Sequence, residues 1–346
     1  MRENSYISNF KIITRLIIFI IVVTVIFSCF GKKYKQAADL NVVNAYTKSR
    51  FDDFYALEKD SLDMVFVGSS HSYCTFDPER IEKYTGLKSF QMGTPLQHAD
   101  TTYYELKEIF KYQKPRFVVM ELYWDVIDDD FEPKQADSFF EVLKDDDIKK
   151  EYIKKVFPLG AKVKYALAAI RYQQEYFAYM SSQIEKEIAE KKGVAKKQEE
   201  TNGTEYYRSL GYTFCDTVLP KTEYDETNQF KGLDGNNWQP SKTQLKYIRK
   251  LSDLCRENGA KLIMVTAPIA NVSMEYIKNY DKIHSQLEKI SEDAMAEDYI
   301  DYNIVNSEEH LLENENFRDD AHLNDSGVEI VDKHFSKWLK GTIKGI

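Results

Sequence analysis

Two short segments at opposite ends of the chain carry residue types that together could perform nucleophilic catalysis. Gly68-Ser69-Ser70-His71-Ser72 follows an apolar run, and Asp319-Asp320-Ala321-His322 lies near the C-terminus. A serine hydroxyl becomes a nucleophile when a histidine takes its proton, and an acid beside that histidine fixes its tautomer and stabilises the imidazolium. The sequence therefore predicts Ser70 as the nucleophile, His322 as the general base and Asp319 as the orienting acid.

Each segment, taken alone, also has an ordinary structural interpretation. A serine-rich turn between a strand and a helix often does no more than cap the helix, and Asp325 would cap a helix that follows a solvated loop histidine. The catalytic interpretation depends on the elements that bring the two segments together.

The pattern of apolar runs predicts alternating strands and helices. Five runs bounded by turn residues read as strands: Met64–Val67, Lys88–Met92, Phe117–Leu122, Lys261–Thr266 and Tyr299–Ile304. Helical patterns occupy 78–86, 100–112, 241–258, 273–296 and 325–340. This alternation predicts an α/β fold, a parallel sheet with helices on both faces. Ligands of such sheets bind beyond the carboxyl ends of the strands, where we expect both chemical segments.

The alternation breaks after the third predicted strand, and we predict a helical insertion at about 126–240. One long helical pattern runs from Ala161 to Lys192, and four tyrosines share one of its faces. They are Tyr165, Tyr172, Tyr176 and Tyr179. We expect this insertion to pack over the strand ends, with the tyrosines forming a core or lid surface rather than a glycan platform.

An uncharged apolar stretch near the N-terminus predicts a membrane anchor at 1–33. Residues 16–30 read LIIFIIVVTVIFSCF, which is just long enough to span a bilayer if the flanking residues contribute. No small-residue cleavage site follows it, and the bulky Phe27 disfavours a lipoprotein signal that ends at Cys29. Basic residues lie on both sides of the stretch, so charge alone does not orient it.

Composition narrows the class of protein. The chain has 346 residues, 43% hydrophobic residues and a net charge of −9, which excludes a disordered or collagen-like chain and disfavours nucleic-acid binding. Residues 1–33 carry five Lys or Arg and one Glu, so the remaining chain carries −13. The four cysteines form no CxxC pair and no two histidines have metal-ligand spacing, so we expect neither a disulfide framework nor a metal site.

The two chemical segments resemble the conserved blocks of the SGNH (GDSL-type) hydrolase superfamily. The resemblance covers about 63–122 and 261–339, and it is to the membrane-anchored branch that includes alginate O-acetylation proteins and the DltD proteins of teichoic-acid D-alanylation. It implies a flavodoxin-like parallel sheet with Ser70 in the Gly-x-Ser block and Asp319 and His322 in the Asp-x-x-His block. It further implies an oxyanion hole formed by the amides of Ser70 and Gly93.

Two departures from the family pattern stand out. Ser69 replaces the usual aspartate before the nucleophile, and the Gly-x-Asn-Asp block after the third strand is replaced by Glu121-Leu122-Tyr123-Trp124-Asp125, without the asparagine donor. Four residues beside the predicted site loops are weaker candidates for substrate contact: His71, His98, Glu121 and Tyr123.

The resemblance implies a single-pass protein of the cell membrane with an extracytoplasmic catalytic domain. Its expected activity is that of a serine esterase or O-acyltransferase on a cell-envelope glycan, such as a teichoic-acid-like polymer, with a membrane-bound O-acyltransferase as partner and no cofactor. The missing asparagine favours an alternative, a catalytically weak accessory protein that binds glycan or a partner in an O-acylation system. A lipid or sterol esterase is a third alternative and would need an apolar pocket.

Overall fold

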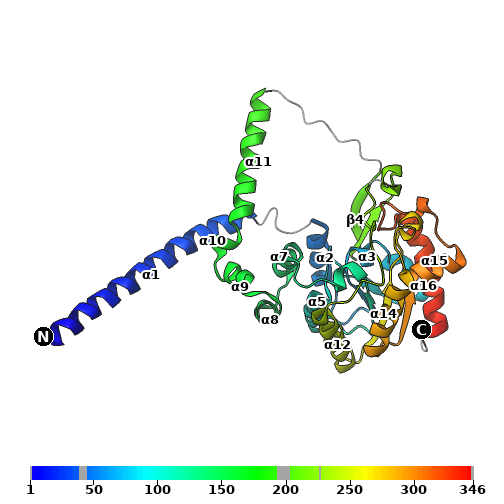
Figure 1. Cartoon of the computed structure of the whole chain (residues 1–346), viewed down its shortest axis with the longest axis horizontal. Helices are drawn as coiled ribbons and strands as arrows, with labels where there is room; N and C mark the ends of the chain where they lie inside the picture. The colour runs from blue at the N-terminus through cyan, green and yellow to red at the C-terminus, as the bar shows by residue number, and fades with distance from the viewer. Residues whose placement is uncertain (1, 39–44, 193–202, 226, 344–346) are drawn as a thin grey trace. The chain divides into compact units, whose positions relative to one another are not determined.

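The structure is a computed structural model that describes residues 2–38, 45–192, 203–225 and 227–343 (Figure 1). The chain divides into two compact units. The anchor unit comprises Met1–Val43 and Ile153–Gln198, and the sheet unit comprises Asn44–Tyr152 and Glu199–Ile346.

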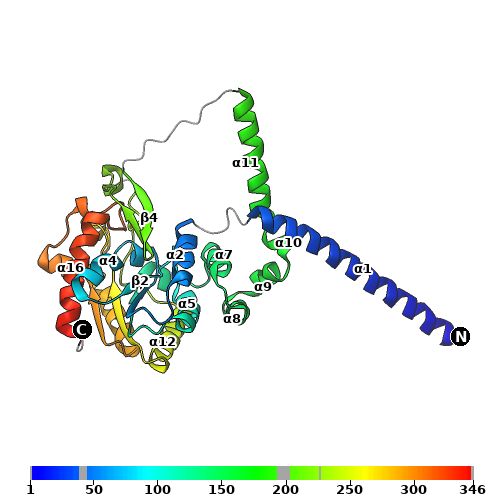
Figure 2. The ribbon, with the colours of Figure 1, turned by 180° about the vertical axis from the view of Figure 1, so that it is seen from behind.

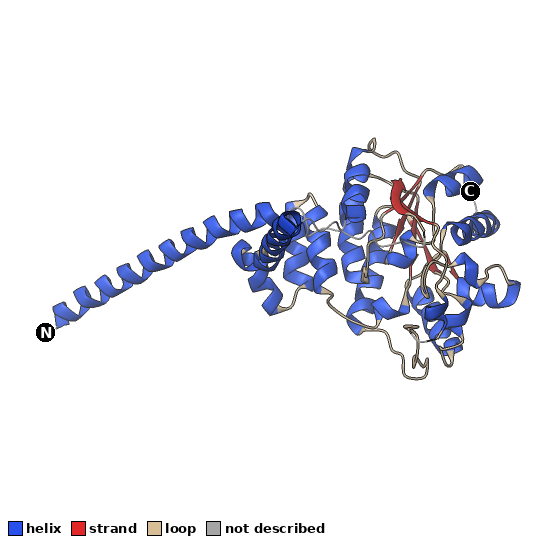
Figure 3. Cartoon of the chain, turned by 90° about the horizontal axis from the view of Figure 1, so that it is seen from above, coloured by secondary structure: helices blue, strands red, loops and turns tan. Residues whose placement is uncertain are grey.

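A five-stranded parallel sheet forms the centre of the sheet unit, with strand order β2-β1-β3-β6-β7. The strands are β1 (Met64–Val67), β2 (Ser89–Gln91), β3 (Phe117–Glu121), β6 (Lys261–Thr266) and β7 (Asp298–Asp301). Counted along this sheet the order is 2-1-3-4-5, a common order of doubly wound sheets. The expected α/β class is confirmed: the sheet is parallel and helices flank it (Figure 3).

The helices that cover the sheet carry apolar stripes at helical spacing. On α16, Val328, Val331, Phe335 and Leu339 are buried in one cluster with Phe66 and Ile263 of the sheet, among other residues. The helices of the sheet unit are α2 (Ala45–Ala56), α3 (Ser70–Tyr73), α4 (Pro78–Thr85), α5 (Ala99–Tyr112), α6 (Trp124–Ile127), α7 (Pro133–Val142), α12 (Lys242–Glu257), α13 (Asn271–Met274), α14 (Tyr280–Asp293), α15 (Tyr302–Glu309) and α16 (Asp325–Thr342), with 3-10 turns η1 (Lys221–Tyr224) and η2 (Asn314–Asn316). Helix α8 (Asp146–Val156) runs across the boundary between the units.

Two predicted elements end earlier than their apolar patterns suggest. The strand predicted at Tyr299–Ile304 stops at Asp301, because the Asp301 carboxylate accepts a hydrogen bond from Asn303 N (2.9 Å) and so begins α15. The helix predicted at 273–296 is two helices, and Asn279 adopts a left-handed conformation (φ +53°) between them.

A β-hairpin that was not predicted lies within the expected helical insertion. It consists of β4 (Glu205–Ser209) and β5 (Tyr212–Cys215), and its turn contacts β2 and α2 (Figure 2). Gln91 N donates to the Leu210 carbonyl (2.9 Å), and Arg50 Nε of α2 donates to the Gly211 carbonyl (2.9 Å). A Cβ at Gly211 would lie 1.8 Å from the Gln91 carbonyl oxygen, so only glycine permits this approach.

The anchor unit contains α1 (Arg2–Ala38), α9 (Leu159–Ala166), α10 (Ala168–Arg171) and α11 (Gln173–Lys192). The single helix predicted at Ala161–Lys192 is therefore interrupted, and its tyrosines do not share one continuous face. The part of the expected insertion from Ile153 to Lys192 belongs to the same compact unit as α1. Within α1, Phe10–Gln36 is long and apolar enough to cross a membrane.

Candidate active site

Ser70 is placed at the carboxyl edge of the sheet by a turn that needs glycine. Strand β1 ends at Val67, and Gly68 follows with φ +137°, a conformation that side chains disfavour. A Cβ at Gly68 would also lie 2.8 Å from Glu121 Cβ. Ser69 then caps α3 by accepting a hydrogen bond from His71 N (3.2 Å), and Ser70 is the first residue of that helix.

Ser70, His322 and Asp319 form a continuous chain of hydrogen bonds. Ser70 Oγ lies 2.9 Å from His322 Nε2, and His322 Nδ1 lies 2.9 and 3.0 Å from the two Asp319 carboxylate oxygens. Because an ionised carboxylate only accepts, His322 Nδ1 carries the proton and Nε2 is left as the acceptor for the Ser70 hydroxyl. The arrangement can therefore remove the proton of Ser70 when its oxygen attacks an electrophile.

The Asp319 carboxylate is held ionised by its neighbours. It accepts hydrogen bonds from the backbone amides of Ala321 (2.9 Å) and His322 (2.7 Å), and Arg318 Nε lies 3.4 Å away. Burial alone would raise the pKa of Asp319, but His322 and Arg318 outweigh it and hold the pKa well below its usual range. An ionised Asp319 can stabilise the positive charge that His322 gains when it takes a proton.

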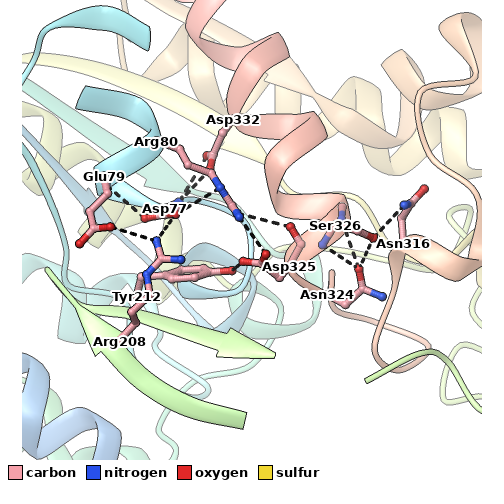
Figure 4. A network of polar contacts seen from close by, with 11 residues as sticks. Asp77, Glu79, Arg80, Arg208, Tyr212, Asn316, Asn324, Asp325, Ser326 and Asp332 are labelled. Atoms are coloured by element: carbon pink, nitrogen blue, oxygen red, sulfur yellow. Dashed lines mark hydrogen bonds and ion pairs between the residues drawn. The ribbon is translucent and has the colours of Figure 1, made fainter. Parts of the chain in front are cut away.

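The loop that carries His322 is fixed by the start of α16 (Figure 4). Asn324 caps the helix by accepting from Ser326 N (3.1 Å) and Gly327 N (3.2 Å). The next residue, Asp325, accepts hydrogen bonds from Arg80 Nη2 of α4 and Tyr212 OH of the hairpin, both at 2.8 Å. Helix α4, the hairpin and the start of α16 are thus joined next to the loop that carries His322.

The two amides predicted to form the oxyanion hole have different surroundings. Ser70 N donates to no residue of the described chain. A Cβ at Gly93 would lie 2.9 Å from the Ser69 carbonyl oxygen, so glycine lets this loop approach the nucleophile turn. Gly93 N, however, donates to Gln91 Oε1 (2.9 Å), which also accepts from Ser72 Oγ (3.1 Å). Of these two amides, Gly93 N has an acceptor and Ser70 N has none among the described residues.

Glu121 packs against the turn formed by Gly68 and Ser69 and is only 3% exposed. Its Oε2 accepts hydrogen bonds from Ser69 N (3.0 Å) and Ser69 Oγ (2.8 Å), whereas its Oε1 has no partner among the described residues. Burial raises the pKa of Glu121 to about 7, against the lowering effect of the two Ser69 hydrogen bonds. Glu121 therefore contacts the backbone amide and the side chain of Ser69 and is shielded from solvent.

His71 and Tyr123 pack side by side next to the triad. Their rings are stacked with centroids 3.7 Å apart, and the His71 ring lies 4.6 Å from that of His322. Burial, and then the nearby His322, hold the pKa of His71 well below its usual value, so His71 is neutral at physiological pH. Tyr123 lines a cavity of about 260 Å³ together with Trp124, Asp125, Gln229, Phe230, Lys231 and Leu233.

His98 lines a second cavity, of about 430 Å³, whose other lining residues are mostly acidic: Leu96, Asp125, Val126, Asp128, Asp129 and Glu132. Asp125 belongs to both cavities. Burial, reinforced by the charge of Asp125, raises the pKa of Asp128 to about 6. Of the four weaker candidates, His98 and Tyr123 therefore lie at cavities, whereas His71 and Glu121 support the triad.

Two contributors to the site were not predicted. Arg318 directly precedes Asp319, so its charge beside the acid is visible in the sequence. Gln91 lies inside a predicted strand, and no pattern marks it as the link between Ser72 and Gly93. Over the described part of the chain, no group of three or more His, Cys, Asp or Glu could hold a metal ion.

No protein-family model matches the chain, and no curated protein matches it.

Proposed function

We propose that this protein is a serine esterase or O-acyltransferase of the SGNH type that acts on cell-envelope glycans. The observation that carries the proposal is the hydrogen-bonded chain from Ser70 Oγ through His322 to Asp319. The strand order and the position of Ser70 directly after β1 agree with the SGNH resemblance.

The geometry supports a two-step acyl transfer. Ser70 Oγ attacks the ester carbonyl carbon while His322 Nε2 takes the hydroxyl proton, and the Ser70 amide donates to the oxyanion. The tetrahedral intermediate collapses, and His322 returns the proton to the departing alkoxide. Water then attacks the acyl-enzyme in an esterase, or a sugar hydroxyl attacks it in a transferase, and His322 again takes and returns the proton.

The apolar N-terminal helix supports a membrane-anchored form of this activity. An anchored enzyme stays near a membrane partner that delivers acyl groups, and the SGNH resemblance makes that partner a membrane-bound O-acyltransferase. We therefore place the sheet unit outside the cytoplasm, with an envelope polymer as the acceptor.

A second candidate function is a glycan-binding or partner-binding accessory protein with little catalysis. It is favoured by the engagement of Gly93 N with Gln91 and by Glu121 at the place of the family's asparagine, which leave Ser70 N as the available donor.

Active-site labelling separates the two candidates. The full-length protein should react with a fluorophosphonate probe and hydrolyse p-nitrophenyl acetate, and Ser70→Ala should abolish both. Ser307→Ala, at an exposed serine of α15, serves as the matched control and should retain both. Equal labelling of Ser70→Ala and wild type would refute the enzyme proposal. Acetyl transfer to added envelope polysaccharide then distinguishes a transferase from an esterase.

A further inference from the structure

Helices α10 and α11 pack against the C-terminal part of α1. A Cβ at Gly31 would lie 2.9 Å from Ala168 Cβ, so glycine at this position of α1 allows the close approach of α10. The rings of Tyr34 and Tyr176 are stacked with centroids 4.5 Å apart. Gly31 is buried, whereas most described side chains of α1 are exposed. These contacts make α1 part of the folded anchor unit.

Within the anchor unit, α11 runs across α1 and not along it. In Figure 1, α11 meets α1 near the C-terminal end of α1 and runs away from it at an angle. If α1 crosses a bilayer, α11 therefore begins at the end of the membrane-crossing segment, where Tyr176 stacks on Tyr34.

The helices that meet this end of α1 expose large apolar side chains. On α11, Phe177, Met180 and Ile184 are spaced by three and four residues, so they share one face, and they are 59%, 39% and 55% exposed. Leu159, Val163 and Leu167, at and just after α9, are 79%, 53% and 39% exposed. Exposed apolar patches of this kind mark a protein or membrane contact.

The position of Leu167 points to lipid as the partner. Leu167 lines one cavity with Thr24, Phe27 and Ser28 of α1, so it reaches the level of the apolar stretch itself. The exposed apolar side chain between α9 and α10 thus adjoins the apolar stretch of α1.

Basic residues lie at the same end of α1. Lys32, Lys33 and Lys35 follow the apolar stretch, and α9 carries Lys162 and Lys164 and no acid. Helix α11 carries both signs, with four Glu and three Lys. Cations at this level complement anionic lipid headgroups, in contrast to the net charge of −13 on residues 34–346.

We propose that α9, α10 and α11 form a second membrane contact. These helices lie in the interface of a bilayer that contains anionic lipid, with the exposed apolar side chains among the acyl chains and the lysines at the headgroups. The protein is then attached both by a crossing helix and by a helix along the surface. This inference is independent of the catalytic proposal.

Tryptophan scanning of α11 in full-length protein tests the contact. Phe177→Trp and Tyr179→Trp differ by two positions, which places them on opposite sides of the helix, and both are conservative aromatic changes. Each variant is reconstituted in vesicles of phosphatidylcholine and phosphatidylglycerol in equal amounts, with and without acyl-chain bromine. The wild-type signal of the three native tryptophans is subtracted, and circular dichroism checks that helicity is unchanged.

We expect bromine to quench the added fluorescence of Phe177→Trp several-fold more than that of Tyr179→Trp, with a blue-shifted emission for the former. Equal quenching of the two variants, or none, would overturn the proposal. Quenching of Phe177→Trp that falls as protein density in the vesicle rises would instead assign the face to a second copy. Unchanged quenching in pure phosphatidylcholine would refute the part assigned to anionic headgroups.

Discussion

Replacing Glu121 by glutamine should make the protein more stable at alkaline pH and leave it nearly unchanged at acid pH. Glutamine keeps a carbonyl oxygen for the two Ser69 hydrogen bonds and removes a charge that is 3% exposed. The pKa of Glu121 is raised from about 4.5 to about 7, so the folded state resists ionisation. The part of the folding free energy that depends on a neutral Glu121 is therefore fully present below pH 4.5. It is lost as the pH rises from there through about 7.

The size of the effect follows from the two pKa values. At about 1.36 kcal/mol for each pH unit between them, the wild-type protein loses about 3 kcal/mol above pH 7 that Glu121→Gln does not lose. Other buried carboxyls, such as Glu105, titrate in both proteins and cancel in the comparison.

Urea unfolding in detergent micelles, followed by tryptophan fluorescence, measures this difference. All three tryptophans, Trp124, Trp238 and Trp338, belong to the sheet unit, so the signal reports on the unit that contains Glu121. The gain in unfolding free energy of Glu121→Gln over wild type should grow by about 3 kcal/mol between about pH 5 and about pH 8.5. A gain that is the same at both pH values would show that Glu121 is not a buried carboxyl with a raised pKa.

Three further changes probe the same architecture. Asp319→Asn should lower kcat for p-nitrophenyl acetate by about 10³-fold or more, because an amide does not hold the histidine in the working tautomer; activity near wild type would contradict the triad. Gly211→Ala should reduce the unfolding free energy by about 3 kcal/mol or more, since its Cβ would meet a backbone carbonyl. The control Gly232→Ala, with the same φ of +88° and open space around it, should cost only about 1 kcal/mol; equal losses for the two would disprove the close approach. Ser69→Ala removes one hydrogen bond from Glu121, which should shift the alkaline loss of stability to a higher pH in the same urea assay; an unshifted loss would exclude that bond as a determinant of the pKa.

Local patterns in the sequence predict most of the sheet. β1 and β6 have the predicted bounds, because each is an apolar run between turn residues. The pattern at 161–192 continues through Leu167 and Tyr172, where the helices break, so periodicity alone does not reveal the breaks. The hairpin escaped prediction because β4 is polar and at least partly exposed and β5 is only four residues long. The position of the hairpin also depends on a contact with β2, which the sequence does not reveal.

In the candidate site, too, local patterns predict some features and tertiary contacts determine the others. Ser70 and His322 could be assigned to one edge of the sheet because each lies next to a predicted element. The contact of Glu121 with Ser69 requires the strand register, in which Val67 lies opposite Met120, so that the next residues, Gly68 and Glu121, are brought together. Register is set by tertiary packing and is not visible in one sequence.

The packing of the hairpin turn against β2 also bears on self-association of the protein. β2 is an edge strand, and the unpaired amides and carbonyls of an edge can pair with another chain. The Gln91 amide is already occupied by the Leu210 carbonyl, and the turn lies against this part of the strand. This turn therefore protects part of the exposed edge of the sheet from pairing with another chain.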